Sequence, residues 1–241
     1  MFVRSLFLLI LLSQLTLTNA ESDIPIIQKD PHRNEMGFFD VHVCNWPDRP
    51  VFFKTLFSST KYNDIQSMEI FHPDGKRLGD LDLRHYMKID RKGKPYKRVF
   101  MKDIPVPEGS RDGWYTITVT SKTGKKYTAK DYVVMTRLPR PTGMNPPDGA
   151  EDVPMPKELT WDPLPGAKHY QVYIRDAFEN KMILSSKLLN EPRLEIKPGL
   201  LEPGGFYSWS IHSRDVNENV VLGDFNIGSL SEKSIFSIAD E

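Results

Sequence analysis

The sequence predicts an all-β protein built from two tandem antiparallel β-sandwich domains. Three observations lead to this prediction: short runs of alternating apolar and polar residues, turn residues between those runs, and a Pro- and Gly-rich segment that begins near residue 139. No long stretch has the apolar period of a helix. With 241 residues, the chain has the length of one large domain or of two domains of roughly 100 residues each.

The first twenty residues predict a secretory signal peptide. Arg4 precedes an apolar run over residues 6–12, and a polar stretch then ends in the small residue Ala20. This layout is typical of a cleaved leader, with cleavage after Ala20. The apolar run is shorter than the roughly 20 residues that cross a bilayer, which favours cleavage over an uncleaved anchor helix. We therefore expect an exported protein, periplasmic or extracellular, with no transmembrane segment in the mature chain.

Cys44 is the only cysteine, so the chain has no internal disulfide. An exported protein of this kind depends on its hydrophobic cores for stability, which fits a bacterial periplasm or cell surface. The sequence leaves open whether Cys44 is buried, free or paired with another molecule.

A cluster of chain-breaking residues marks the domain boundary. Residues 139–154 contain Pro139, Pro141, Pro146, Pro147, Pro154, Gly143 and Gly149. Such a segment continues neither a helix nor a central strand, and we predict a semi-rigid linker with a turn. Residues 21–138 then form the first sandwich, and residues 155–241 form the second.

In the second domain, an aromatic strand follows a tight corner. Tyr207, Trp209 and Ile211 alternate with polar residues, so their side chains share one face of a strand and pack inward. The preceding "LEPGG", residues 201–205, predicts the corner that leads into this strand.

These residues carry a resemblance. Leu201, Pro203 and Tyr207 have the spacing of the corner before the sixth strand of fibronectin type III domains. Trp161 and Tyr170 stand where that family has the aromatic residues of its second and third strands. The resemblance covers about residues 140–239. It implies the fold and is nearly silent on function, because this module serves adhesion, spacing and enzyme decoration alike.

The first domain more loosely resembles a bacterial immunoglobulin-like sandwich, through its strand rhythm. The runs "GFFDVHVC" and "GWYTITVT" alternate, and Tyr115, Ile117 and Val119 share one face. "FHPDGKRLG" predicts a hairpin turn at residues 73–75. The nearest approach to a short helix is "KYNDIQSMEI", residues 61–70.

Reactive residues are few. Asp40, His42 and Cys44 share one face of the strand "DVHVC" and are all metal-ligand types. Same-face neighbours on a strand are about 7 Å apart along its axis, so three from one strand do not converge on an ion, and we favour a lone buried thiol. Motifs of nucleophilic, zinc and phosphate-loop sites are missing from the sequence. We therefore expect no catalytic residues, no metal and no cofactor.

Charge is distributed unevenly although the net charge is zero. Residues 21–139 carry 21 basic and 16 acidic residues, a balance of +5, whereas residues 140–241 carry 10 and 16, a balance of −6. The basic excess lies in residues 84–102, where only Asp90 is acidic. The basic residues there are Arg84, Lys88, Arg91, Lys92, Lys94, Lys97, Arg98 and Lys102.

Two tyrosines, Tyr86 and Tyr96, are interleaved with these cations and are able to stack on a sugar. Gly93 and Pro95 predict a turn at the centre of the segment. The predicted ligand-binding residues are Arg91, Lys92, Lys94, Tyr96, Lys97 and Arg98. An anionic glycan or an envelope protein is the expected partner, rather than nucleic acid. Two alternatives stay open: a solvated hairpin, or a basic face docked on the acidic second domain.

The segment 215–232 is longer than an ordinary connection between strands, and it is apolar. We predict a recognition surface here, with Val221, Asp224, Phe225 and Ile227 as ligand-binding residues. The alternative is an extra hairpin that packs back on the sandwich.

Together these features predict an exported, non-catalytic binding or scaffolding protein of the cell envelope that recognises a protein or a glycan. The competing class is a small envelope hydrolase, or an accessory glycan-binding module of one. The sequence does not indicate the oligomeric state.

Overall fold

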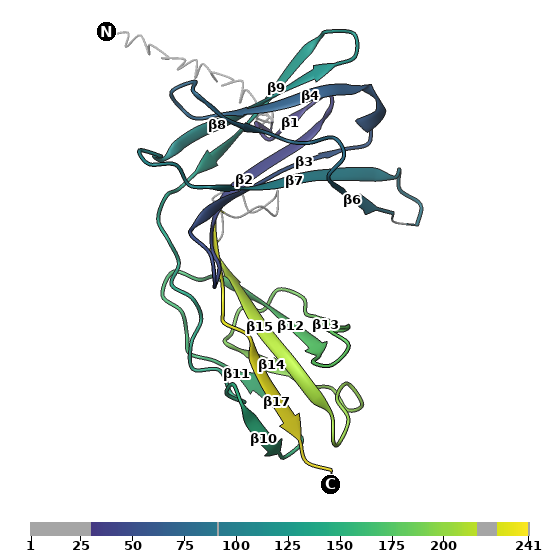
Figure 1. The fold of residues 1–241 in the computed structure, drawn as a ribbon, viewed down its shortest axis with the longest axis vertical. Helices are drawn as coiled ribbons and strands as arrows, with labels where there is room; N and C mark the ends of the chain where they lie inside the picture. The colour runs from purple at the N-terminus through teal and green to yellow at the C-terminus, as the bar shows by residue number, and fades with distance from the viewer. Residues whose placement is uncertain (1–29, 91, 216–225, 241) are drawn as a thin grey trace, which may run out of the picture.

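A computed structural model describes residues 30–90, 92–215 and 226–240 of the chain (Figure 1). The described residues form β-strands and connecting turns, with one short 3₁₀ segment, η1, at Tyr62–Asp64. The predicted all-β fold is therefore confirmed. Among these residues, no helix is long and apolar enough to cross a membrane. The predicted signal peptide lies outside the described residues.

Two sheets form the first domain. The strands of one sheet are β1 (Arg33–Asn34), β2 (Gly37–Asn45), β3 (Phe52–Ser59), β7 (Lys97–Pro105) and β6 (Tyr86–Ile89). The strands of the other, in spatial order, are β5 (Arg77–Asp80), β4 (Ile65–Phe71), β8 (Gly113–Ser121) and β9 (Lys126–Val133). All pairs within these two sets of strands are antiparallel.

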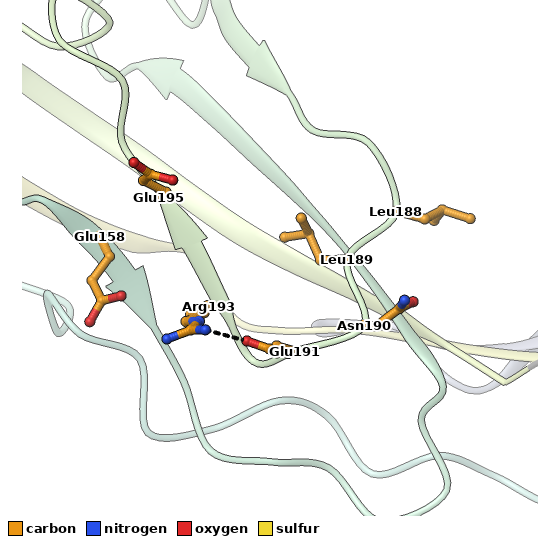
Figure 2. Close-up of a pocket in the computed structure, with 7 residues that line it drawn as sticks. All are labelled: Glu158, Leu188, Leu189, Asn190, Glu191, Arg193 and Glu195. Atoms are coloured by element: carbon orange, nitrogen blue, oxygen red, sulfur yellow. Dashed lines mark ion pairs between the residues drawn. The ribbon is translucent and has the colours of Figure 1, made fainter.

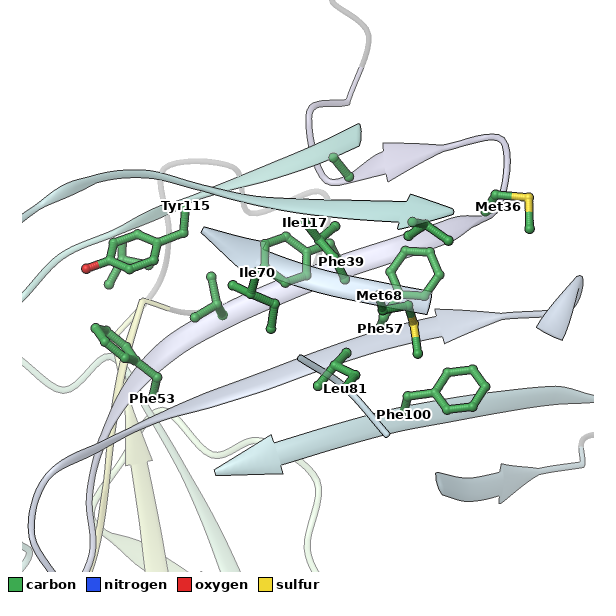
Figure 3. Packing of buried hydrophobic residues seen from close by; sticks show 14 of the residues in the cluster. Met36, Phe39, Phe53, Phe57, Met68, Ile70, Leu81, Phe100, Tyr115 and Ile117 are labelled. Atoms are coloured by element: carbon green, nitrogen blue, oxygen red, sulfur yellow. The ribbon is translucent and has the colours of Figure 1, made fainter. Parts of the chain in front are cut away.

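The core of this domain lies between the two sheets, as Figure 3 shows. Phe39, Phe57 and Phe100 from the first sheet pack with Tyr115 and Ile117 from the second. The predicted inward face of β8 is confirmed, because its alternate residues are buried while the neighbouring Trp114 is 46% exposed. Alternation of side chains along a strand is what sorts them in this way.

The segment 61–70, the nearest approach to a helix in the sequence, is mostly strand. Only Tyr62–Asp64 is helical, and β4 begins at Ile65. Ile65, Met68 and Ile70 are buried because β4 pairs with β8 in the middle of its sheet. The turn predicted at residues 73–75 is present, with the Gly75 N–H donating to the His72 carbonyl at 3.0 Å.

The second domain also consists of two packed sheets. The larger contains β10 (Ala150–Val153), β17 (Ser234–Ile238), β15 (Phe206–Arg214), β12 (His169–Asp176) and β13 (Met182–Ser185). The smaller contains β11 (Glu158–Thr160) and β14 (Arg193–Glu195). Leu159 of β11 and Leu194 of β14 pack in one core with Val172 and Trp209 of the larger sheet.

The predicted corner before Tyr207 has a specific geometry. The Glu202 N–H donates a hydrogen bond to the Tyr207 hydroxyl at 2.9 Å, and the ring is only 6% exposed. A Cβ atom at Gly205 would overlap the Tyr207 ring, so that position requires glycine. A buried tyrosine that bonds back to the chain upstream is the corner of immunoglobulin-type sandwiches.

The segment predicted as a linker, 139–154, is partly strand. Ala150–Val153 forms β10, which pairs in parallel with β17, and Asn145 forms a bridge with Thr160. The prolines of this segment all lie outside β10, so none of them interrupts its pairing with β17.

One strand joins the two domains. β16 (Ile227–Leu230) pairs antiparallel with β15 and in parallel with β2, so a single sheet continues from the second domain into the first (Figure 1). Ile227, predicted as a ligand-binding residue, is instead buried at 6% exposure in the first domain's core. Val221, Asp224 and Phe225, predicted with it, lie outside the described residues.

Candidate functional site: a basic and aromatic hairpin

The strands β6 and β7 form an antiparallel hairpin, residues 86–105, which we call the basic hairpin. Its turn is where the sequence predicts it, and Gly93 has a φ of +76°, which favours glycine. Lys92 and Lys94 are exposed at this turn. Arg91, also predicted to bind a ligand, lies outside the described residues.

The guanidinium of Arg98 lies close to two aromatic rings. Its guanidinium carbon lies 4.2 Å from the ring centroid of Tyr62 and 4.2 Å from that of Tyr86. Arg98 stands two residues before the buried Phe100 on β7, so both side chains share the inward face of the sheet. A guanidinium stacked on aromatic rings loses little freedom when it binds a further group.

Tyr96 completes the aromatic cluster. Its ring lies 5.5 Å from that of Tyr62, at an interplanar angle of 82°. The structure therefore brings the predicted residues Tyr96 and Arg98 together. It adds Tyr62, which sequence reasoning missed because the residue belongs to the separate segment η1 and no local pattern links it to β7.

Around the turn of the basic hairpin, the cations have no acidic partner among the described residues. In the described part of the chain, no ion pair forms at Lys88, Lys92, Lys94, Lys97 or Arg98. The flanking cations differ, because Arg84 lies 2.8 Å from Asp82 and Lys102 lies 3.5 Å from Asp80. Lys88 and Arg98 are also direct partners across β6 and β7, a like-charge pairing that destabilises a sheet.

A cavity of about 200 Å³ adjoins the guanidinium of Arg98. Its lining residues are Tyr62, Asn63, Ile65, Leu83, Arg98, Phe100 and Lys122. The Nε atom of Arg98 is buried and has no hydrogen-bond partner. A buried donor without an acceptor costs about 1–3 kcal/mol.

The alternative in which the basic face docks on the acidic second domain finds no support in the contacts. Within the described ranges, no hydrogen bond or ion pair joins residues 86–98 to the second domain. β6 is the edge strand of its sheet, at the far end from β16 (Figure 1).

A second surface feature, on the second domain, has the opposite charge. A groove there has a volume of about 640 Å³. Its lining residues, drawn in Figure 2, are Glu158, Leu188, Leu189, Asn190, Glu191, Arg193 and Glu195. Arg193 is paired with Glu191 at 2.7 Å, which leaves Glu158 and Glu195 directly opposite each other across β11 and β14. The groove is therefore acidic, and an anionic ligand is repelled from it.

The side chains of Asp40, His42 and Cys44, all on β2, are buried. His42 Nδ1 lies 3.0 Å from Asp40 Oδ2. Burial by itself lowers the pKa of His42, but the charges and hydrogen bonds of Asp40 and Cys44 together outweigh it and raise the pKa to about 10. Nowhere in the described ranges do three or more His, Cys, Asp or Glu side chains gather so as to hold a metal ion.

No family model and no curated protein matches the chain. Among solved structures, it is similar to the chicken CNTN1 FN1–FN3 domains, with 12% identity over 85% of this chain and 65% of that one, at a TM-score of 0.30. Dimeric latent PorU from Porphyromonas gingivalis matches with 12% identity over 90% and 21%, at 0.29.

A third structure is SGBP-B of the Bacteroides ovatus mixed-linkage glucan utilization locus, in complex with a mixed-linkage heptasaccharide. It matches with 10% identity over 80% of this chain and 42% of that one, at a TM-score of 0.24. The chain thus spans less than two thirds of each of these structures, and at such low similarity they transfer no ligand or activity to it.

Proposed function

We propose that this chain is an exported, non-catalytic binding or scaffolding protein of the cell envelope, and that its basic hairpin binds an anionic glycan or an acidic protein. The observation that carries the proposal is a set of cations, Lys88, Lys92, Lys94, Lys97 and Arg98, that form no ion pair within the described residues. Elsewhere in the same domain, Arg49 and Lys54 share Asp103, and Arg77 pairs with Glu69.

Uncompensated charge of one sign attracts a ligand of the other sign and steers its approach. Lys92 and Lys94 at the turn contribute long-range attraction, whereas Arg98 offers a planar fork that matches a carboxylate. Tyr62, Tyr86 and Tyr96 supply rings beside these cations. A hairpin that only faces water does not need a guanidinium packed against two aromatic rings.

The finer domain assignment is part of the same proposal. The hydrogen bond between Glu202 and Tyr207, and the packing of Trp161 on Tyr170 at 5.3 Å, support a fibronectin type III-like second domain. An immunoglobulin-like first domain rests on its two packed antiparallel sheets. Export rests on the predicted signal peptide, residues 1–20.

The competing function is a small envelope hydrolase, and the acidic groove is the place to consider for it. Glycoside hydrolysis uses two carboxyl groups, one of which is kept protonated by its surroundings. Glu158 and Glu195 are both exposed on the outer side of their strands. Neither residue is buried, which supports a binding role over a catalytic one.

A glycan panel tests the proposal. Labelled anionic and neutral glycans, together with envelope extract, are captured at low salt by the wild type and by a variant with Lys92, Lys94 and Lys97 changed to Gln. We expect the loss of three solvent-accessible charge contacts, worth roughly 0.2–1 kcal/mol each, to weaken capture of anionic glycans about 3- to 150-fold. Neutral glycans should be unaffected.

A matched control changes three exposed lysines of the second domain, Lys157, Lys187 and Lys233, to Gln. This variant has the same net charge and should capture anionic glycans like the wild type. Equal losses in both variants would show a general effect of charge and contradict a site on the hairpin. Glycan cleavage that co-purifies with the protein would instead establish the hydrolase.

A further inference from the structure

The guanidinium of Arg98 has hydrogen-bond donors that the described residues leave unused. The ring centroids of Tyr62 and Tyr86 each lie 4.2 Å from its guanidinium carbon. Within the described residues, the guanidinium N–H groups donate no hydrogen bond. An acceptor that reaches the Nη groups from the cavity therefore gains a charge-assisted hydrogen bond.

The cavity beside Arg98 has room for such an acceptor. Its volume of about 200 Å³ equals the share of about six or seven waters in the liquid. A carboxylate fits there together with the ring or chain that carries it. A planar carboxylate also matches the guanidinium fork in two parallel hydrogen bonds.

The other residues that line the cavity favour a carboxylate on a sugar over a carboxylate on an amino-acid side chain. Ile65, Leu83 and Phe100 make one part of the wall apolar, whereas Asn63 and Lys122 bring an amide and an ammonium group. A sugar ring has C–H groups for the apolar wall and hydroxyl groups for the polar side chains. An aspartate or glutamate side chain has the carboxylate but no hydroxyl groups for Asn63 and Lys122.

We infer that the cavity beside Arg98 is a subsite for one uronic-acid residue of a glycan, whose carboxylate binds the guanidinium edge of Arg98. This inference rests on the proposed binding function and specifies its ligand class. The exposed lysines of the hairpin attract the anionic chain, and the cavity selects a carboxylate-bearing sugar within it.

The experiment uses the full-length protein and oligogalacturonate, with the same oligosaccharide reduced at its carboxyl groups as the neutral probe. Affinities are measured by calorimetry for the wild type, Arg98→Lys and Lys122→Gln. Arg77→Lys is the matched control, because Arg77 is an exposed arginine with its own acidic partners. The ¹⁵N resonance of the Arg98 Nε–H group, identified by its loss in Arg98→Lys, reports directly on the guanidinium.

We expect the wild type to prefer oligogalacturonate over the reduced probe at least tenfold and to shift the Arg98 Nε–H resonance on binding. Arg98→Lys should lose this preference, Lys122→Gln should weaken it several-fold, and Arg77→Lys should keep it. Lys122 is exposed, so its replacement tests the cavity without disturbing the stacked arginine.

The inference is overturned if Arg98→Lys keeps the preference, or if a glutamate-rich peptide shifts the Nε–H resonance and oligogalacturonate does not. Those results leave the proposed function intact when the Lys92, Lys94 and Lys97 variant still loses capture of sulfated glycans. If the wild type captures no anionic probe at low salt, the proposed function fails, and the uronate subsite fails with it.

Discussion

Ile227 of β16 lies directly beside Val43 of β2, in a parallel strand pair that crosses from the second domain to the first. The Val43 N–H donates to the Asn226 carbonyl at 3.0 Å, and the Ser229 hydroxyl donates to the Pro139 carbonyl at 2.7 Å. The side-chain amide of Asn45 donates to the Leu138 carbonyl at 2.9 Å. Hydrogen bonds thus connect β2 and β16 with the segment that links the domains. The two sandwiches share a continuous hydrogen-bonded sheet.

The shared strand predicts that the two domains are energetically coupled. Ile227→Ala removes a buried side chain at the junction and should destabilise the protein by about 2–5 kcal/mol. Hydrogen exchange should accelerate in β2 of the first domain as well as in β15 of the second. Ile238→Ala, an equally buried change at the far end of the second domain, is the control for β2. If Ile227→Ala leaves exchange in β2 unchanged, the domains are not coupled through β16.

The tyrosine corner predicts that two substitutions of Tyr207 lower the free energy of unfolding by different amounts. Tyr207→Ala leaves a cavity in the second core and should cost about 3–5 kcal/mol, as for other large core truncations. Tyr207→Phe keeps the ring but removes the acceptor of the Glu202 N–H, and should cost about 0.5–1.5 kcal/mol. Urea unfolding midpoints measure both. A Tyr207→Ala protein as stable as the wild type would rule out this corner.

The His42–Asp40 pair predicts a loss of stability in alkali. The pKa of His42 is about 10 in the folded protein, against an ordinary value of 6.5, so the folded state binds more protons than the unfolded state between these values. The contribution is complete below pH 6.5 and is lost as the pH rises toward 10. The slope reaches at most about 1.4 kcal/mol per pH unit.

The measurement is the free energy of unfolding in urea at several pH values from 6 to 10. His42→Gln should flatten the decline, whereas His85→Gln, at an exposed histidine, should not. An unchanged alkaline slope in His42→Gln would show that another group titrates.

The like-charge pair on the basic hairpin predicts a trade-off between stability and binding. Lys88 is the direct cross-strand partner of Arg98, so Lys88→Thr should raise the free energy of unfolding by about 0.2–1 kcal/mol and weaken capture of anionic glycans at low salt. Lys126→Thr is the control, since Lys126 is paired with the uncharged Thr120. A Lys88→Thr protein that is less stable than the wild type would contradict this account of the pair.

Local patterns in the sequence predicted what local physics determines. Alternation placed Tyr207, Trp209 and Ile211 correctly on one buried face, and turn residues located the hairpins at residues 73–75 and at Gly93. These features need only the period of a strand and the backbone freedom of glycine.

Contacts between distant segments were not predictable in this way. His32 Nε2 lies 3.0 Å from Asp131 Oδ1, although the residues are 99 positions apart. The stacking of Tyr62 on Arg98 and the pairing of β16 with β2 are of the same kind. A single sequence carries no local signal for such pairs, because only the assembled sheets bring them together. The sequence therefore predicted the charged residues of the candidate site and Tyr96. It did not predict the cavity or the packing of Arg98 against Tyr62 and Tyr86.

The dependence of glycan binding on salt tests the central claim most directly. Affinity for oligogalacturonate is measured from about 0.01 M to 0.1 M salt, where the screening length falls from about 30 Å to about 10 Å. We predict that the wild type binds more tightly than the Lys92, Lys94 and Lys97 variant at low salt, and that the two affinities converge as salt rises. Equal affinities of the two proteins at 0.01 M salt would show that the basic hairpin is not the binding site.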